Sequence, residues 1–110
     1  MLKDLVAQTI AFSCATLFHM EQTTQTLITK YPAWSVSGET LVGNWTVANF
    51  AELRAIISRL CDLADELNHH PQVTFGYNQL TVETTTHDAG NTITEKDIEL
   101  AQRVSELVGE

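Results

Sequence analysis

The chain has 110 residues and a formal net charge of −8, from 14 acidic and six basic residues. Hydrophobic residues make up 44% of it, which is typical of a globular protein, and the length fits one domain over residues 1–110. The basic residues are scattered, so neither a nucleic acid nor a membrane surface is expected as a direct partner. Cys14 and Cys61 lack metal-type spacing, and we expect buried, reduced thiols in a cytoplasmic protein.

The first third of the chain carries a helical pattern and then a strand pattern. Apolar residues recur three to four positions apart from Leu2 onward, which predicts helix over residues 4–30, and Pro32 closes the region. The N-terminal stretch is too polar for a membrane span and too interrupted for a signal peptide. Two short runs with alternating apolar residues then flank Ser37-Gly38-Glu39, which predicts a hairpin.

The segment from residue 49 to residue 68 has the clearest helical pattern. Asn49 and Glu52 stand three residues apart at its start, which is the spacing of a helix-capping pair. Apolar residues follow at alternating spacings of three and four. They are Phe50, Leu53, Ile57, Leu60, Ala64 and Leu67.

A second hairpin and a last helix complete the expected elements. Val73, Phe75 and Tyr77 alternate along one predicted strand, and the run from Leu80 follows as its partner after Asn78-Gln79. Thr94 and Asp97 have capping-box spacing and open a helix whose apolar stripe is Ile98, Ala101, Val104 and Val108. This order predicts an α+β fold, a four-stranded antiparallel sheet with the helices packed on one face.

Three of the four histidines stand at the ends of predicted elements. His69 and His70 fall where a helix meets a strand, because Pro71 disfavours helical geometry at the residue before it. His87 ends the following strand, and an antiparallel return would bring it to the same edge of the sheet. Asp65, four residues before His69, is placed to reach that imidazole. Converging imidazoles can donate and accept protons near neutral pH.

Simpler explanations exist for each of these residues. The histidine pair suits a polar helix C-terminus, and an exposed His87 needs no function. Asp97 can be a capping carboxylate and Asp65 a solvated helix residue, while Trp34 and Trp45 can be packing residues. A zinc site from three histidines and Asp97 lacks the familiar ligand spacings, so no metal is expected. No nucleophile motif or phosphate-binding glycine loop is present either.

The spacing of one set of residues resembles a known family. Asp65, His69-His70-Pro71, Tyr77, His87 and Asp97, together with Trp34, "YNQLTV" and "THDAG", are similar to the signature of pterin-4a-carbinolamine dehydratases over about residues 22–108. The resemblance implies an α+β subunit that forms a homodimer or homotetramer. Residues 1–20 would then be a helical extension to a core at 21–110, or Met20 would be the true start.

The resemblance also implies a reaction without cofactor or metal. Water is lost from a 4a-hydroxy-tetrahydropterin to give the quinonoid dihydropterin, which recycles the pterin of aromatic amino acid hydroxylases. By the resemblance, His69 and His87 would act as acid and base, in an open assignment, and His70 would orient the ring. Trp34 and Pro71 would wall the ring, and Asp65 and Asp97 would orient imidazoles or support the loop.

An alternative is that the chain is a binding or assembly protein. The resemblance implies this too, since relatives serve as dimerisation cofactors or assembly factors. Such a role needs the scaffold and its helical interface only. The presence of all three histidines in register favours catalysis.

Overall fold

The computed structural model describes residues 21–109 of the chain. A helix over residues 21–30 comes first, so this part of the predicted N-terminal helix is confirmed, whereas residues 4–20 lie outside the described residues. The elements that follow are β1 (Trp34–Ser37), β2 (Thr40–Thr46), α2 (Phe50–Leu67), β3 (Gln72–Phe75), β4 (Gln79–Thr84), the short 3₁₀ helix η1 (His87–Ala89) and α3 (Glu95–Val108). Their order confirms the predicted α+β fold.

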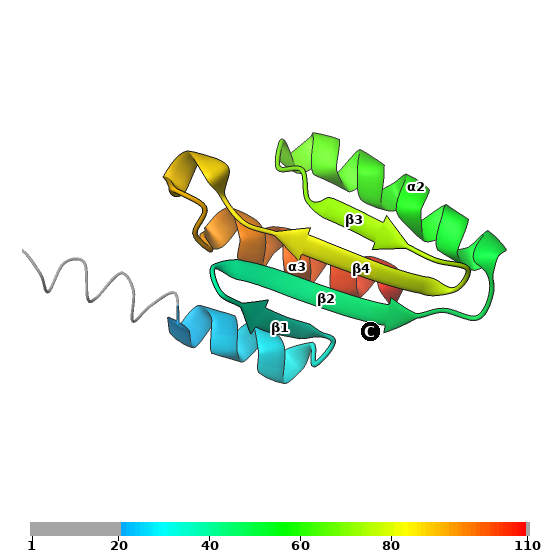
Figure 1. The fold of residues 1–110 in the computed structure, drawn as a ribbon, viewed down its shortest axis with the longest axis horizontal. Helices are drawn as coiled ribbons and strands as arrows, with labels where there is room; N and C mark the ends of the chain where they lie inside the picture. Colours follow the sequence, from blue (N-terminus) through cyan, green and yellow to red (C-terminus); the bar gives the residue numbers. More distant parts are fainter. Residues whose placement is uncertain (1–20, 110) are drawn as a thin grey trace, which may run out of the picture.

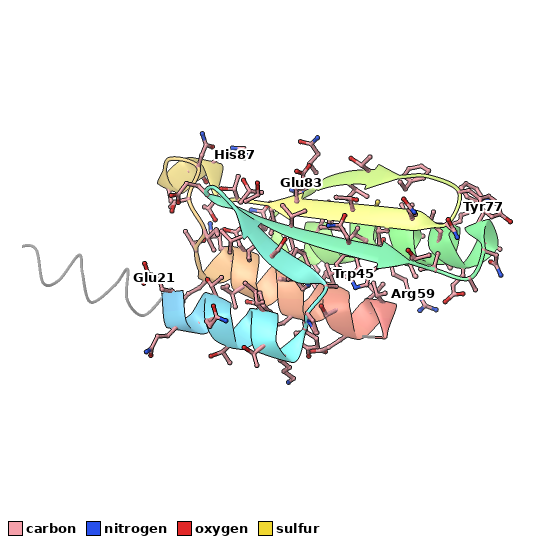
Figure 2. All side chains as sticks on the ribbon, turned by 60° about the horizontal axis from the view of Figure 1, so that its bottom comes forward. Glu21, Trp45, Arg59, Tyr77, Glu83 and His87 are labelled. Carbon is pink, nitrogen blue, oxygen red and sulfur yellow. The ribbon has the colours of Figure 1, made fainter. Side chains whose placement is uncertain are left out.

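The four strands form one antiparallel sheet in the order β1-β2-β4-β3. The two long strands, β2 and β4, lie at its centre, and the short strands β1 and β3 form its edges (Figure 1). The helices lie together on one face, and the other face carries none in the described part of the chain (Figure 2). In β4 the residues on the helix-facing side are Leu80, Val82 and Thr84, and all three are buried.

The core fills the space between the sheet and the helices. Leu27 from the first helix, Leu53 and Leu60 from α2, and Ala101 and Val104 from α3 belong to it. Burial of such side chains is the dominant favourable term in folding. The core therefore fixes how α2 and α3 sit against β4, and this arrangement positions the residues discussed below.

Two tryptophans pack against each other over a glycine in β2. Trp34 and Trp45 meet edge to face, with ring centroids 5.2 Å apart. A Cβ atom at Gly43 would lie 2.4 Å from Cη2 of Trp45, which is too close for any side chain. Gly43 is thus required by this close approach of the indoles.

The predicted cap at the start of α2 is confirmed, and a left-handed residue that was not predicted closes its other end. The Asn49 side chain accepts a hydrogen bond from the backbone N–H of Glu52, at 2.8 Å. At the other end Asn68 adopts the left-handed conformation, with φ 51°, and closes the helix. The backbone N–H of His69 still bonds to the carbonyl of Ala64, at 3.0 Å, before the chain turns into β3.

Three details differ from the sequence-based expectations. Tyr77 lies in the turn after β3 and not in the strand, because Gly76 N–H bonds to the Gln79 carbonyl and ends the pairing at Phe75. Cys61 is exposed on α2 and not buried. The buried face of α2 runs through Ile56 and Leu63 while Phe50 is exposed, so the helix is rotated from the predicted stripe.

Candidate active site

A buried carboxylate lies at the centre of the candidate site. Asp97 is in the first turn of α3 and is fully buried. Its Oδ2 accepts the backbone N–H of Thr94 at 2.8 Å, and Thr94 caps the helix in return, so the predicted capping box is confirmed. Hydroxyl groups of two further threonines reach the same carboxylate, Thr84 on Oδ1 at 2.5 Å and Thr86 on Oδ2 at 2.7 Å.

These donors decide the charge of Asp97. Burial alone would raise the pKa of its carboxyl, because a charged group loses hydration. Hydrogen bonds from Thr84, Thr86, the Thr94 backbone and His69 outweigh that effect and hold the pKa below its ordinary value. Asp97 is therefore an ionised carboxylate at neutral pH.

His69 contacts this carboxylate directly. Its Nε2 lies 2.6 Å from Oδ1 of Asp97 and 3.1 Å from Oγ1 of Thr84, and its side chain is only 11% exposed. The predicted contact between Asp65 and His69 is wrong. The left-handed turn at Asn68 takes His69 out of the helical position four residues after Asp65.

Asp65 contacts the second histidine of the pair instead. Its Oδ1 lies 2.9 Å from Nε2 of His70, and the two side chains are 81% and 61% exposed. This hydrogen-bonded pair is open to water, so Asp65 is also the solvated helix residue that the alternative interpretation described. Adjacent histidines thus have different carboxylate partners, one buried and one at the surface.

His87 is held by the loop that it begins. Its Nδ1 lies 2.6 Å from Oδ1 of Asn91, and the side chain is exposed at one end of the molecule (Figure 2). The Thr86 carbonyl accepts N–H groups of Ala89, Asn91 and Thr92, which closes the loop tightly. Asn91 has a φ of 59°, a left-handed conformation that asparagine tolerates better than most residues. This loop presents the imidazole to solvent.

The three histidines share one end of the sheet. Gln72, at the start of β3, pairs with Glu83 near the end of β4, and η1 follows that end (Figure 1). Within residues 21–109, however, the histidines bond to separate oxygens, and no hydrogen bond joins His87 to the other two. The structure thus brings His69 together with Asp97 and His70 with Asp65, while His87 stands apart.

A groove lined by described residues lies beside this constellation. It measures about 1030 Å³ and runs between the helix over residues 21–30, the β1–β2 turn and the segment from Thr86 to Lys96. Thr86 and Asp88 line it, but none of the three histidines does. The groove and the three imidazoles are therefore separate features of this end of the molecule.

The other predicted site residues have structural surroundings of their own. Trp34 is 1% exposed, and its Nε1 donates to Oγ of Ser105 at 2.7 Å. The packing interpretation of Trp34 is confirmed. Because the side chain is buried, Trp34 would affect a ligand only indirectly, through the residues that it packs against. Pro71 is half-buried just before β3. In the described region, no three His, Cys, Asp or Glu side chains are arranged to hold a metal ion, and no helix is long and apolar enough to cross a membrane.

The residues that bind the Asp97 carboxylate and the His87 ring were not predicted from the sequence. Thr84, Thr86 and Asn91 were not singled out, although each makes a hydrogen bond to a predicted site residue. A signal was present in the run of three threonines, because alternate residues of a strand face the same side. Asn91 stands four residues after His87 and follows a glycine, which favours a turn.

Comparisons with known proteins decide the family. The family model described as pterin 4 alpha carbinolamine dehydratase matches residues 16–107. The chain belongs to this family. A relative from Thermomicrobium roseum, provisionally named a pterin-4-alpha-carbinolamine dehydratase, is 40% identical over 87 residues, which cover 79% of this chain and 92% of the relative. Another with the same provisional name, from Thermosynechococcus vestitus, is 41% identical over 76 residues, 69% of this chain and 79% of the relative.

Solved structures agree with the family assignment. A transcriptional coactivator/pterin dehydratase from Brucella melitensis has a TM-score of 0.71 and 25% identity, over 78% of this chain and 93% of that one. A pterin dehydratase-like protein identified as a RuBisCO assembly factor in the alpha-carboxysome has a TM-score of 0.59 and 23% identity, over 70% and 88%. The second likeness concerns the fold alone. Within the pterin carbinolamine dehydratase family, the match on this chain spans all seven predicted site residues.

Proposed function

We propose that the protein is a hydro-lyase that removes water from a 4a-hydroxy-tetrahydropterin and forms the quinonoid dihydropterin. The observation that carries this proposal is the set of three imidazoles in a member of this family, each with one ring nitrogen held by an oxygen acceptor. Among residues 21–109 no hydrogen bond to the other nitrogen of these rings is described, and in this proposal that nitrogen meets the ligand. The proposal includes a homodimer or homotetramer in the cytoplasm, with an aromatic amino acid hydroxylase as the source of the substrate.

The reaction needs one base and one acid and no oxidant. The N5–H proton leaves to the base, the C4a–O bond breaks as the hydroxyl group takes a proton from the acid, and a C4a=N5 double bond forms. Imidazole titrates close to neutral pH and can serve in either role. We assign His69 and His87 to these two roles and His70 to binding and orienting the ring.

The remaining predicted residues act as supports in this proposal. Asp97 orients His69, and Asp65 orients His70, as their distances of 2.6 Å and 2.9 Å support. Pro71 would contact the pterin ring beside His70. Trp34 would stabilise the wall of the site from the core, given its burial.

A stopped-flow dehydration assay tests the proposal. The 4a-hydroxy-tetrahydropterin is generated in situ, and its decay is followed with and without catalytic amounts of the protein. We expect acceleration that falls about 10²- to 10⁴-fold in His69→Ala and in His87→Ala, the usual contribution of a general acid or base. Glu99→Ala, at an exposed position of α3, is the control and should keep full turnover.

The outcomes separate the catalytic assignments. Circular dichroism establishes that each variant is folded. A folded His87→Ala variant with unchanged turnover would remove His87 from the catalytic set. No acceleration by the folded natural protein would reject the dehydratase proposal as a whole.

A second candidate function is that of a binding or assembly protein on the same scaffold. Phe50, Phe75 and Tyr77 are exposed and lie together, with ring centroids 6.3 Å to 6.4 Å from that of Phe50. Exposed apolar clusters of this kind mark contact surfaces in many proteins. One structural neighbour is named as an assembly factor. An inactive but folded protein in the stopped-flow assay would favour this second function.

A further inference from the structure

Three consecutive threonines at the end of β4 point in two directions. Thr84 and Thr86 send their hydroxyl groups to Asp97. Thr85, between them, sends its hydroxyl to the backbone carbonyl of Glu39, at 2.8 Å. This alternation follows from extended geometry, in which neighbouring side chains face opposite sides. Thr85 can therefore serve as a control for Thr84 and Thr86, because its hydroxyl does not bind Asp97.

The hydrogen atoms of these groups can be assigned from the contacts. A threonine hydroxyl has a single hydrogen, and both Thr84 and Thr86 donate theirs to Asp97. Thr94 lies 2.6 Å from the Thr86 hydroxyl, so Thr94 is the donor in that contact. Oδ1 of Asp97 therefore accepts from Thr84 and from His69, whereas Oδ2 accepts from Thr86 and the backbone N–H of Thr94.

This assignment fixes the tautomer of His69. An ionised carboxylate oxygen cannot donate, and the hydrogen of Thr84 already lies on Asp97. The short contact at 2.6 Å therefore requires that Nε2 of His69 carries the hydrogen. In the neutral imidazole, Nδ1 is then the unprotonated nitrogen and the only ring atom free to accept a proton.

We propose that Thr84 and Thr86 are positioning residues for His69 that act through Asp97. One hydroxyl on each carboxylate oxygen fixes the rotation of the carboxylate, so that Oδ1 faces Nε2 of His69. Thr84 also lies 3.1 Å from Nε2 and limits movement of the ring. The kinetic part of this inference rests on the proposed dehydratase function, but the effect on the tautomer does not.

The two threonines have separable effects. Thr84→Val removes a donor from the oxygen that binds His69, together with the nearest hydroxyl to its ring. Thr86→Val removes a donor from the other oxygen, which keeps the Thr94 backbone N–H. We therefore expect a larger effect from Thr84→Val. Valine keeps the shape of threonine, so the changes remove hydrogen bonds with little change in volume.

Nitrogen-15 NMR of the histidine side chains tests the inference without any assay of activity. Variants Thr84→Val and Thr86→Val are compared with Thr85→Val, the matched control. We expect His69 to be the Nε2–H tautomer in the natural protein and in Thr85→Val, and a mixture of tautomers in the other two. Thr86→Ser, which keeps the hydroxyl, should restore the natural spectrum.

Turnover gives the second readout. Loss of a hydrogen bond to a charged group should lower kcat about 10- to 100-fold in Thr84→Val, with a smaller change in KM and a shifted pH profile. Thr85→Val should keep the natural kcat. Altered tautomers in proteins that have no dehydratase activity would support the positioning role and reject the proposed function.

Two results would overturn the inference. One is a natural protein in which His69 carries its hydrogen on Nδ1, a measurement that needs no variant to fold. The other is an unchanged His69 spectrum and pH profile in both Thr84→Val and Thr86→Val. If the natural protein is an active dehydratase in that second case, the proposed function stands and only the positioning role fails.

Discussion

Two neighbouring histidines in this protein bind two carboxylates in opposite surroundings. His69 and Asp97 lie 2.6 Å apart with the carboxylate fully buried, whereas His70 and Asp65 lie 2.9 Å apart with both side chains more than half exposed. The distances are similar, so distance alone does not rank the two pairs. The buried carboxylate has four hydrogen-bond donors, and the described contacts of Asp65 contain one.

The difference shows how burial changes the importance of a contact between a histidine and a carboxylate. In water the attraction between exposed charges is screened, and ordering two side chains offsets much of it. A buried carboxylate has lost its hydration and depends on protein donors instead. We therefore expect the buried pair to matter for stability and for ring orientation, and the exposed pair to matter little for stability.

The largest effect should follow from removal of the buried carboxylate. Asp97→Ala removes the shared acceptor of four donors and also half of the α3 capping box. We expect a loss of about 3–5 kcal/mol in the free energy of unfolding, measured by urea denaturation. Glu99→Ala, an exposed carboxylate on the same helix, is the control and should change little. A loss below about 1 kcal/mol for Asp97→Ala would contradict the central role of this network.

Acid pH should gradually remove the part of this stabilisation that depends on the charge of Asp97. The pKa of Asp97 is lower in the folded protein than its ordinary value of 3.8, so the unfolded chain takes up this proton first as the pH falls. The stabilisation is fully present above about pH 3.8 and is lost as the pH falls through the folded-state pKa. The urea midpoints of the natural protein and of Asp97→Asn should therefore converge once the pH lies below the folded-state pKa of Asp97. A constant difference down to the lowest pH at which both fold would disprove the assignment.

The smallest effect should come from the exposed pair. Asp65→Ala removes a carboxylate that is 81% exposed, and we expect a change of only about 0–1 kcal/mol in the free energy of unfolding. Added salt should reduce even this difference, because the pair is open to screening. The measurement is the urea midpoint at low and high salt. A loss above about 2 kcal/mol would show that exposure does not separate the two pairs.

Most of the fold was predictable because its signals are local. The hairpin around Gly38 and the capping residues Asn49 and Thr94 all depend on neighbours within a few positions, and the structure confirms them. The errors concern contacts between distant segments. Cys61 was expected to be buried, but the faces of α2 that meet the sheet and α3 are set by tertiary packing.

The candidate site was predictable only in part. The Thr94 and Asp97 spacing revealed a capping box, but sequence spacing does not show that the same carboxylate reaches a histidine 28 residues away. The spacing of Asp65 and His69 suggested a contact that the left-handed residue Asn68 prevents. Asparagine at a helix end is a recognised signal for such a conformation, and it would have argued against a contact between Asp65 and His69.

The capping box of α3 also sets how long the site persists. Helix ends open and close more readily than helix centres, and each opening of this first turn would expose Asp97 and release His69 in the same event. The assembled arrangement therefore lasts only as long as this first turn stays closed. Amide hydrogen exchange at the first turn of α3 would then report the fraction of time for which the imidazole is correctly held.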